Sequence, residues 1–285
     1  MTRGELTHEL AAVLPAQHEA RFIVEEVCGP AGSTSGPLDP TAVDAARALA
    51  GRRCAGEPLQ YVFGHWSFRA LDLLVDPRVL IPRPETEQVV EVALAELADL
   101  APERPVLVDA GTGSGAIALA LATELHSTGG RVVALDASAA ALAVAAQNVD
   151  RVGARHPMLP VTLREGHWLD ALPPDLRGTV TLVVANPPYV SAAEWVALGD
   201  RDVVRREPRR ALVAGPARDG TPGLADVETV LTQARDWLAR PGTVVIELAP
   251  HQAAAAAVLA GALGYAARVE PDLARRPRAL VGRLA

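Results

Sequence analysis

From residue 106 onward, short apolar segments alternate regularly with segments whose apolar residues recur at helical spacing, and this alternation constrains the fold most strongly. The expected strands are 106–110, 131–136, 161–165, 179–185 and 243–249, followed by two near 266–270 and 279–284. The expected helices are 115–125, 138–150, 224–238 and 251–263. Strands that alternate with helices in this way form a mostly parallel sheet with helices on both faces. The sequence therefore predicts an α/β fold for this part of the chain.

The first part of the chain has a helical character. Apolar side chains between residues 4 and 56 recur at helical spacing, and Asp39 before Pro40 is typical of a helix start. No cluster of catalytic residue types occurs in this segment. We therefore expect a small helical domain at 1–56, whose role is either packing or substrate recognition.

Residues 57–83 are expected to form a hairpin linker between the two parts. Short strands are expected at 59–63, 66–68 and 71–75, with Gly64 at a turn. A helix follows over about 86–99, and Thr86 could provide its N-terminal cap. The third domain of this prediction covers residues 84–285.

The charge balance argues against nonspecific nucleic-acid binding. The 285 residues have a net charge of -7, and all 27 basic residues are Arg. Nonspecific nucleic-acid binding depends on a basic surface that neutralises phosphates, so we expect no direct nucleic-acid partner. No apolar run reaches the length of a membrane span, and the N-terminus lacks the pattern of a secretory signal. A cytoplasmic protein without membrane contact is expected.

A glycine-rich turn follows the first strand of the alternating region. Gly111, Gly113 and Ala116 fit the pattern G-x-G-x-x-A at the point where a strand passes into a helix. Glycines at such a turn allow a ligand to approach the backbone closely. The pattern occurs in NAD enzymes, so a dehydrogenase is one alternative at this point, and a glycine turn without a ligand is another.

Asp136 ends the next strand. A carboxylate at this position can accept hydrogen bonds from both hydroxyls of a ribose. NAD enzymes and S-adenosylmethionine enzymes both use this arrangement, so Asp136 indicates an adenosine ligand without choosing between them. The alternative is a structural role at the start of the following helix, where Asp136 or Ser138 could cap it.

The segment Asn186-Pro187-Pro188-Tyr189 follows a strongly apolar strand and favours methyl transfer to a planar nitrogen. Such a nitrogen is a weak nucleophile because its lone pair is delocalised. The Asn186 side-chain oxygen and a main-chain carbonyl of the Pro-Pro turn can accept both of its N–H bonds and so aim the lone pair at a methyl sulfonium. The Tyr189 ring can pack on the flat group.

The chain resembles the HemK-type protein-(glutamine-N5) methyltransferases, which methylate the glutamine of the Gly-Gly-Gln loop in peptide chain release factors. The resemblance covers nearly the whole chain. It is carried by Gly56-Glu57-Pro58-Leu59-Gln60-Tyr61 with Gly64, Leu80-Ile81-Pro82-Arg83-Pro84-Glu85-Thr86-Glu87, Asp109 through Gly115, Asn186-Pro187-Pro188-Tyr189, Glu207-Pro208-Arg209-Arg210-Ala211-Leu212 and Glu247-Leu248-Ala249-Pro250-His251-Gln252.

The resemblance implies a fold, a cofactor and a set of site residues. The fold is a Rossmann-like class I methyltransferase domain with a seven-stranded, mostly parallel sheet and an antiparallel last strand, preceded by a helical domain and a hairpin. The cofactor is S-adenosylmethionine, no metal is implied, and the partners are release factors. The implied cofactor residues are Gly111, Thr112, Gly113, Ser114, Gly115, Asp136, Asn186 and Trp168, whose ring would stack on adenine. Asn186, Pro187, Pro188 and Tyr189 would hold the substrate glutamine, and Asn186, Pro187 and Tyr189 would serve catalysis.

Two positions depart from the family pattern. Where the family usually has an acid that binds the adenine amino group, just before Trp168, this chain has His167. A neutral imidazole can accept one hydrogen bond, so cofactor affinity could depend on pH. Near the C-terminus, Arg275 stands in place of a glycine, which leaves the conformation of that loop open.

The leading hypothesis is glutamine-N5 methylation of release factors by direct methyl transfer. One alternative is an N6-adenine DNA or RNA methyltransferase, which shares the Asn-Pro-Pro-Tyr segment but needs a basic target-recognition region. The other is a non-catalytic S-adenosylmethionine-binding homologue whose site has changed at His167.

Overall fold

The computed structural model describes residues 1–30, 36–125, 129–198 and 203–285. The chain divides into two compact units. The first comprises Met1–His65 and Gly199–Arg206, and the second comprises Trp66–Leu198 and Glu207–Ala285.

The first unit is helical, as expected. Its helices are α1 (Arg3–Ala11), α2 (Glu19–Cys28), α3 (Pro40–Cys54) and the short α4 (Leu59–Phe63), with a 3-10 turn η2 (Val203–Arg206). The predicted start of α3 is confirmed, because the Asp39 side chain accepts a hydrogen bond from the backbone N–H of Thr41 and Pro40 is the first helical residue. Leu6, Ile23 and Ala46 are fully buried in a core of its own.

The prediction of a strand at 59–63 is wrong, because this segment forms α4. Leu59 packs into the helical core, and Gly64 ends the helix in the left-handed conformation with a φ of 78° instead of turning a hairpin. A five-residue apolar run does not distinguish a strand from one buried helical turn. The hairpin itself is confirmed as β1 (His65–Phe68) and β2 (Leu71–Leu74).

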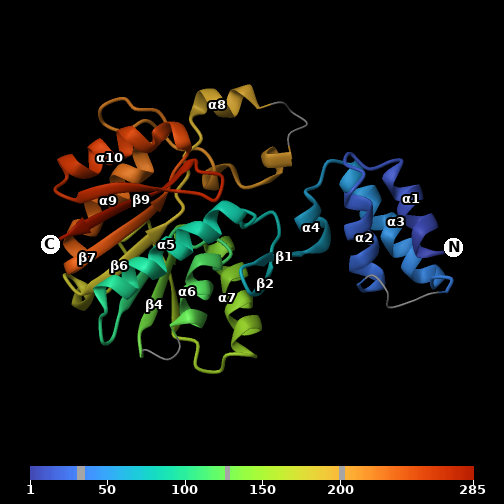
Figure 1. Cartoon of the computed structure of the whole chain (residues 1–285), viewed down its shortest axis with the longest axis horizontal. Helices are drawn as coiled ribbons and strands as arrows, with labels where there is room; N and C mark the ends of the chain where they lie inside the picture. Colours follow the sequence, from blue (N-terminus) through green and yellow to red (C-terminus); the bar gives the residue numbers. More distant parts are fainter. Residues whose placement is uncertain (31–35, 126–128, 199–202) are drawn as a thin grey trace. The chain divides into compact units, whose positions relative to one another are not determined.

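The second unit contains the predicted seven-stranded sheet (Figure 1). Its strands are β3 (Val106–Ala110), β4 (Arg131–Asp136), β5 (Val161–Glu165), β6 (Val180–Ala185), β7 (Leu238–Glu247), β8 (Ala266–Pro271) and β9 (Pro277–Leu284). The strand order is β5-β4-β3-β6-β7-β9-β8, in which β9 runs antiparallel to both of its neighbours and the other pairs are parallel. The Rossmann-like class I methyltransferase fold is therefore confirmed.

Helices cover both faces of this sheet (Figure 1). One face carries α5 (Pro84–Leu100), α6 (Ala116–Glu124) and α7 (Ala139–Gly153), and the other carries α9 (Ala225–Trp237) and α10 (Ala253–Ala262). Alternate residues of β3 pack on opposite sides, since Leu107 lies in the core under α5 and α6 whereas Val108 lies in the core under α9. The shorter helices are α8 (Ala192–Ala197), which was not predicted, and the 3-10 turns η1 (Pro174–Leu176), η3 (Arg209–Ala211) and η4 (Pro250–Gln252).

The predicted cap of α5 is wrong. The helix begins at Pro84 with Arg83 as its N-cap, so Thr86 lies inside the first turn. Thr86 is 4% exposed, and its hydroxyl donates a 2.6 Å hydrogen bond to Glu247 at the end of β7. The side chain therefore joins the helix to the sheet instead of satisfying the helix N-terminus.

Arg275 adopts a backbone conformation that favours glycine. Its φ is 60°, in the left-handed region, in the loop between β8 and β9. Asp272 closes this loop by accepting hydrogen bonds from the backbone N–H and the guanidinium of Arg276. The family's glycine therefore has a conformational reason, and this chain forms the turn with a strained Arg.

Candidate active site

The carboxyl ends of three neighbouring strands place the predicted site residues at one edge of the sheet. In the register of the sheet, Ala110 at the end of β3 pairs with Leu135 of β4 and with Ala185 of β6. The chain leaves these strands toward Gly111, Asp136 and Asn186, and a cavity opens where the three segments meet. Ligands of open α/β sheets bind at such edges.

The glycine turn after β3 leaves room for a flat side chain. Gly111, Gly113 and Gly115 all have a positive φ, between 56° and 86°. A Cβ on Gly111 would lie 3.0 Å from the Trp168 ring, closer than such contacts normally allow. The turn therefore requires glycine both for its conformation and for the indole that packs against it.

The backbone N–H groups of this turn are already used within the protein. Gly111 and Thr112 both donate to the Leu135 carbonyl at 2.8 Å, and Gly113 donates to Asp136 Oδ2 at 2.9 Å. A dinucleotide turn instead directs its N–H groups at a pyrophosphate. The turn is therefore better suited to a nucleoside ligand that lacks a pyrophosphate than to NAD.

Asp136 is held rigidly at the cavity. One carboxylate oxygen accepts from Gly113 and the other accepts from the backbone N–H of Ser138 at 2.8 Å. Burial raises the pKa of Asp136, and the two backbone hydrogen bonds and the charge of Arg210 oppose that rise. Each carboxylate oxygen has a second lone pair, so Asp136 can still accept from a ribose hydroxyl.

Asp109 lies beneath the same turn and is fully buried. Its Oδ2 accepts from the Thr112 hydroxyl at 2.6 Å and from the Ala118 N–H at 3.0 Å, whereas Oδ1 has no hydrogen-bond partner among the described residues. Burial raises the pKa of Asp109 to about 7. An unpaired buried carboxylate oxygen is costly, which favours the protonated form of Asp109.

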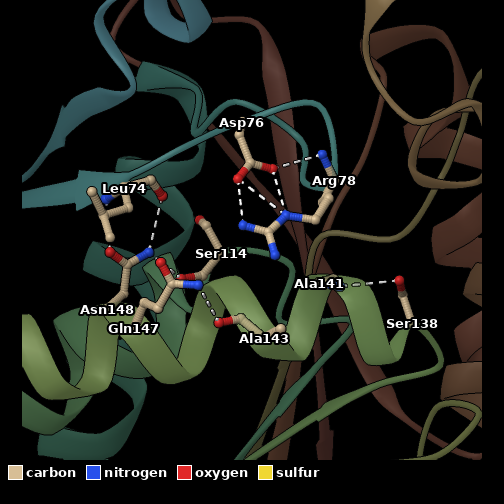
Figure 2. Close-up of polar contacts among 9 residues, drawn as sticks. All are labelled: Leu74, Asp76, Arg78, Ser114, Ser138, Ala141, Ala143, Gln147 and Asn148. Carbon is tan, nitrogen blue, oxygen red and sulfur yellow. Dashed lines mark hydrogen bonds and ion pairs between the residues drawn. The ribbon is translucent and has the colours of Figure 1, made fainter.

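Asn148 of α7 ties the glycine turn to the hairpin (Figure 2). Its side chain accepts from the Leu74 N–H at 2.7 Å and donates to the carbonyls of Leu74 and Ser114 at 3.0 and 2.9 Å. Asn148 is 0% exposed, so these bonds form away from solvent. Figure 2 also shows the Asp76–Arg78 ion pair in the segment after the hairpin, which continues to Val79 and Leu80 at the cavity.

Trp168 lies in the cavity beside two polar groups. Its ring meets His167 edge-on, and its Nε1–H donates to Asp226 of α9 at 3.2 Å. Burial raises the pKa of Asp226, and the hydrogen bond from Trp168 and the proximity of His167 oppose that rise. All three residues line the cavity. An acid is therefore present beside Trp168 after all, but α9 supplies it instead of the preceding residue.

The segment after β6 is rigidly held. Asn186 donates through Nδ2 to the Thr86 hydroxyl at 3.1 Å, and the Tyr189 hydroxyl donates to Glu247 at 3.4 Å. Gln252 donates to the Tyr189 carbonyl at 2.9 Å. Gly223 approaches that carbonyl so closely that a Cβ there would lie 2.4 Å from it. Burial raises the pKa of Tyr189 above its ordinary value, as does the neighbouring Glu247.

Glu207 joins the two outer segments of the cavity. It is 5% exposed, accepts from the Ile81 N–H at 3.0 Å and forms an ion pair with Arg83. Its neighbours Pro208 and Arg210 line the cavity, as does Leu80. The Ile-Pro-Arg-Pro and Glu-Pro segments are therefore parts of one wall.

The structure brings together only some of the predicted residues at the cavity surface. Gly111, Gly113, Asp136, Trp168, Asn186 and Pro188 line it. The described residues that line it do not include Thr112, Ser114, Gly115, Pro187 or Tyr189. Asp109, Asp226, Thr86 and Glu247 were not predicted as site residues. Asp109, Thr86 and Glu247 lie in segments that carry the family resemblance, but no role in the site was assigned to them.

Comparisons with known proteins agree with this geometry. A model of the methyltransferase small domain family matches residues 90–206. The protein "Release factor glutamine methyltransferase" of Burkholderia pseudomallei is 41% identical over 251 residues, covering 87% of this chain and 83% of that protein. The chain belongs to the release factor glutamine methyltransferase family.

A second member of the release factor glutamine methyltransferase family, from Moorella thermoacetica, is 42% identical over 230 residues, which cover 80% of this chain and 75% of that protein. A solved methyltransferase of Pyrococcus furiosus shares the fold, with a TM-score of 0.51 and 17% identity over 84% of this chain and 97% of that one. The resemblance and the class of enzyme are thus confirmed, and the cofactor of the family is S-adenosylmethionine. None of the helices in the described part of the chain is long and apolar enough to cross a membrane.

Proposed function

We propose that this enzyme transfers a methyl group from S-adenosylmethionine to the side-chain nitrogen of the glutamine in the Gly-Gly-Gln loop of peptide chain release factors. The observation that carries the proposal is the position of Asn186. Its amide lines the same cavity as Asp136 and Trp168, so a flat amide held by Asn186 would lie beside the bound cofactor.

The residues of the cavity fit S-adenosylmethionine. Asp136 would accept from the ribose hydroxyls, and Trp168 offers a flat face beside the glycine turn for adenine. Asp226 would accept a hydrogen bond from the adenine amino group. It would thereby take the role of the acid that the family usually has at the position of His167.

The cofactor supplies an electrophilic methyl group on a sulfonium. The protein orients the acceptor: the Asn186 side-chain oxygen and the Pro187 carbonyl would each accept one N–H of the glutamine amide. Fixing both N–H bonds aims the nitrogen lone pair at the methyl carbon and stabilises the positive charge that develops on nitrogen. Methyl transfer would replace the bond between the methyl carbon and sulfur with a carbon–nitrogen bond, and the glutamine nitrogen would release one proton to solvent.

We also propose a division of labour between the parts of the chain. Residues 1–56 would recognise the release factor, 57–83 would act as a linker and 84–285 would carry out methyl transfer. The separate core around Leu6 and Ile23 supports an independent role for the helical part. The proposed substrate places the enzyme in the cytoplasm, with a protein and not a nucleic acid as its direct partner.

The proposal is tested by incubating the enzyme with labelled S-adenosylmethionine and, in parallel, an intact release factor, a release factor whose loop glutamine is replaced by alanine, and double-stranded DNA. We expect label only in the intact release factor. Label in DNA would support the N6-adenine alternative, and cofactor binding without labelling of any substrate would support the non-catalytic alternative.

A further inference from the structure

A chain of hydrogen bonds connects Asn186 to a buried carboxylate behind the cavity. Asn186 Nδ2 lies 3.1 Å from Thr86 Oγ1, which lies 2.6 Å from Glu247 Oε2. Thr86 is 4% exposed and Glu247 is 0% exposed. The three side chains come from the segment after β6, from α5 and from β7, so the arrangement depends on the folded domain and not on a local motif.

The chemistry of these groups fixes the direction of every bond in the chain. An ionised carboxylate only accepts hydrogen bonds, so the single proton of the Thr86 hydroxyl is donated to Glu247. Thr86 Oγ1 can then only accept from Asn186, which requires the amide nitrogen of Asn186 to face it. The side-chain oxygen of Asn186 therefore occupies the opposite side of the amide. The hydrogen-bond partners therefore determine which end of the Asn186 amide is nitrogen and which is oxygen.

We propose that Thr86 and Glu247 are positioning residues that lock the Asn186 amide so that its oxygen, and not its nitrogen, is presented to the substrate amide. The proposal rests on the proposed function, because it concerns how Asn186 accepts an N–H from the substrate glutamine. If the Asn186 amide were flipped, its NH2 group would face the N–H of the substrate glutamine, and no hydrogen bond could form between two donors. Methyl transfer would then lose one of the two contacts that orient the nitrogen.

The surroundings of Glu247 make this lock sensitive to pH. The groups that face Glu247 are Thr86 and Glu85 of α5, Tyr189 after β6 and Arg278 of β9. Burial raises the pKa of Glu247 to about 6; the hydrogen bond from Thr86 and the charge of Arg278 oppose the rise, while the charge of Glu85 adds to it.

Protonation of Glu247 would reverse the chain. A neutral Glu247 can donate to Thr86, and the Thr86 proton then becomes available to the oxygen of Asn186. Both amide orientations of Asn186 would be populated below about pH 6. We therefore expect the turnover number at saturating substrates to fall as the pH drops through this range.

The test uses Thr86→Val, Thr86→Ser and Glu247→Gln, with Thr229→Val as the matched control, because the Thr229 hydroxyl donates to the Ala225 carbonyl of its own helix. The turnover number and KM for release factor methylation are measured from pH 5 to 8, and S-adenosylhomocysteine affinity is measured by calorimetry. Circular dichroism reports folding.

We expect Thr86→Val to lower the turnover number by about 10- to 100-fold, since misplacement of an orienting group costs up to this much. Thr86→Ser should recover most of the loss, and the affinity for S-adenosylhomocysteine should stay within about twofold of wild type, because Thr86 does not line the cavity. The amide of Glu247→Gln does not titrate in this range, so this variant should lack the decline near pH 6.

Three results would overturn the positioning role. These are a Thr86→Val enzyme with the wild-type turnover number, a Thr86→Ser enzyme as impaired as Thr86→Val, and a Glu247→Gln enzyme with the same acid decline as wild type. If Thr86→Val fails to fold, the turnover number of Thr86→Ser and the pH profile of Glu247→Gln still test the positioning role. A wild-type enzyme that methylates no release factor would instead contradict the proposed function.

Discussion

At the scale of single residues, the site is built from carboxylates whose environments differ. Asp136 accepts two backbone N–H groups, Asp109 has an unpaired buried oxygen, and Asp226 shares a hydrogen bond with Trp168 at the cavity. The three acids surround the glycine turn and its aromatic neighbour. Asp136 and Asp226 line the cavity, where we propose that they bind different parts of the cofactor, whereas Asp109 lies beneath the turn.

Asp226→Asn should weaken cofactor binding. An asparagine can still accept from the Trp168 N–H, but it presents a donor where the carboxylate offered a second acceptor to adenine. We expect the affinity for S-adenosylhomocysteine to fall about tenfold, as for the loss of one hydrogen bond to a charged group. Calorimetry with S-adenosylhomocysteine and S-inosylhomocysteine measures the effect.

The control for this variant is Asp170→Asn, which neutralises a nearby exposed acid that accepts from Gln233. It should bind both ligands like wild type. The preference for the adenine over the inosine ligand should shrink only in Asp226→Asn. An unchanged preference would show that Asp226 does not read the adenine amino group.

Asp109 should make the ligand-free enzyme less stable as the pH rises. Its pKa is about 7 in the folded protein and about 3.9 in an unfolded chain, so the folded state binds the extra proton between these values. Lowering the pH from 8 to 6 should therefore add about 1 kcal/mol to the free energy of unfolding. Urea denaturation at both pH values measures this gain.

Asp109→Asn should lack that gain, because the amide does not titrate in this range. Thr112 can still donate to the oxygen of the asparagine, so the glycine turn keeps one of its supports. An equal pH dependence in the variant and the wild type would assign the effect to another group.

At the scale of elements, the glycine turn depends on support from α7. Asn148→Ala leaves the Leu74 N–H, the Leu74 carbonyl and the Ser114 carbonyl without their buried partner (Figure 2). We expect a loss of about 2–3 kcal/mol in the free energy of unfolding, measured by urea denaturation. Cofactor affinity should also fall, because Ser114 belongs to the turn.

Gln147→Ala is the matched control for this prediction. Gln147 precedes Asn148 on the same helix and donates to the Ala143 carbonyl of its own helix, at an exposed position (Figure 2). Its loss should change the free energy of unfolding by less than about 0.5 kcal/mol. Equal effects of the two substitutions would show that the buried connection to the hairpin does not support the turn.

The elements of the sheet could be predicted from the sequence because long apolar strands alternate with helices of clear periodicity. The strands β3, β4 and β5 have the predicted bounds. The segment 59–63 could not be assigned, since its burial comes from packing of Leu59 into the helical core. The partners of Asn186 could not be predicted either, because Thr86 is 100 residues away in the sequence. Asp226 was missed because α9 brings it to Trp168 only in the folded chain.

At the scale of the whole molecule, the helical unit carries apolar side chains that its own core does not cover. Phe22 of α2 is 44% exposed, next to the fully buried Ile23. Single exposed apolar residues are common, so position alone does not establish a role. Within the proposed division of labour, however, Phe22 is a natural contact for a protein substrate.

Phe22→Ala should therefore raise the KM for an intact release factor about 5- to 10-fold and leave the turnover number unchanged, as expected for lost binding that does not involve the reacting groups. Steady-state kinetics with the intact factor and with a short Gly-Gly-Gln peptide measures the effect, which the peptide should not show. Val258→Ala, at an exposed position on α10, is the control. An unchanged KM would remove Phe22 from the recognition surface.

Glutamine methylation is tested most directly by tandem mass spectrometry of an intact release factor after incubation with S-adenosylmethionine and either the wild-type enzyme or Asn186→Ala. We predict one added methyl group on fragments that contain the glutamine of the Gly-Gly-Gln loop with the wild-type enzyme, and none above the enzyme-free background with Asn186→Ala. Methylation at another residue, or equal methylation by both enzymes, would contradict the assignment of Asn186 as the group that holds the substrate amide.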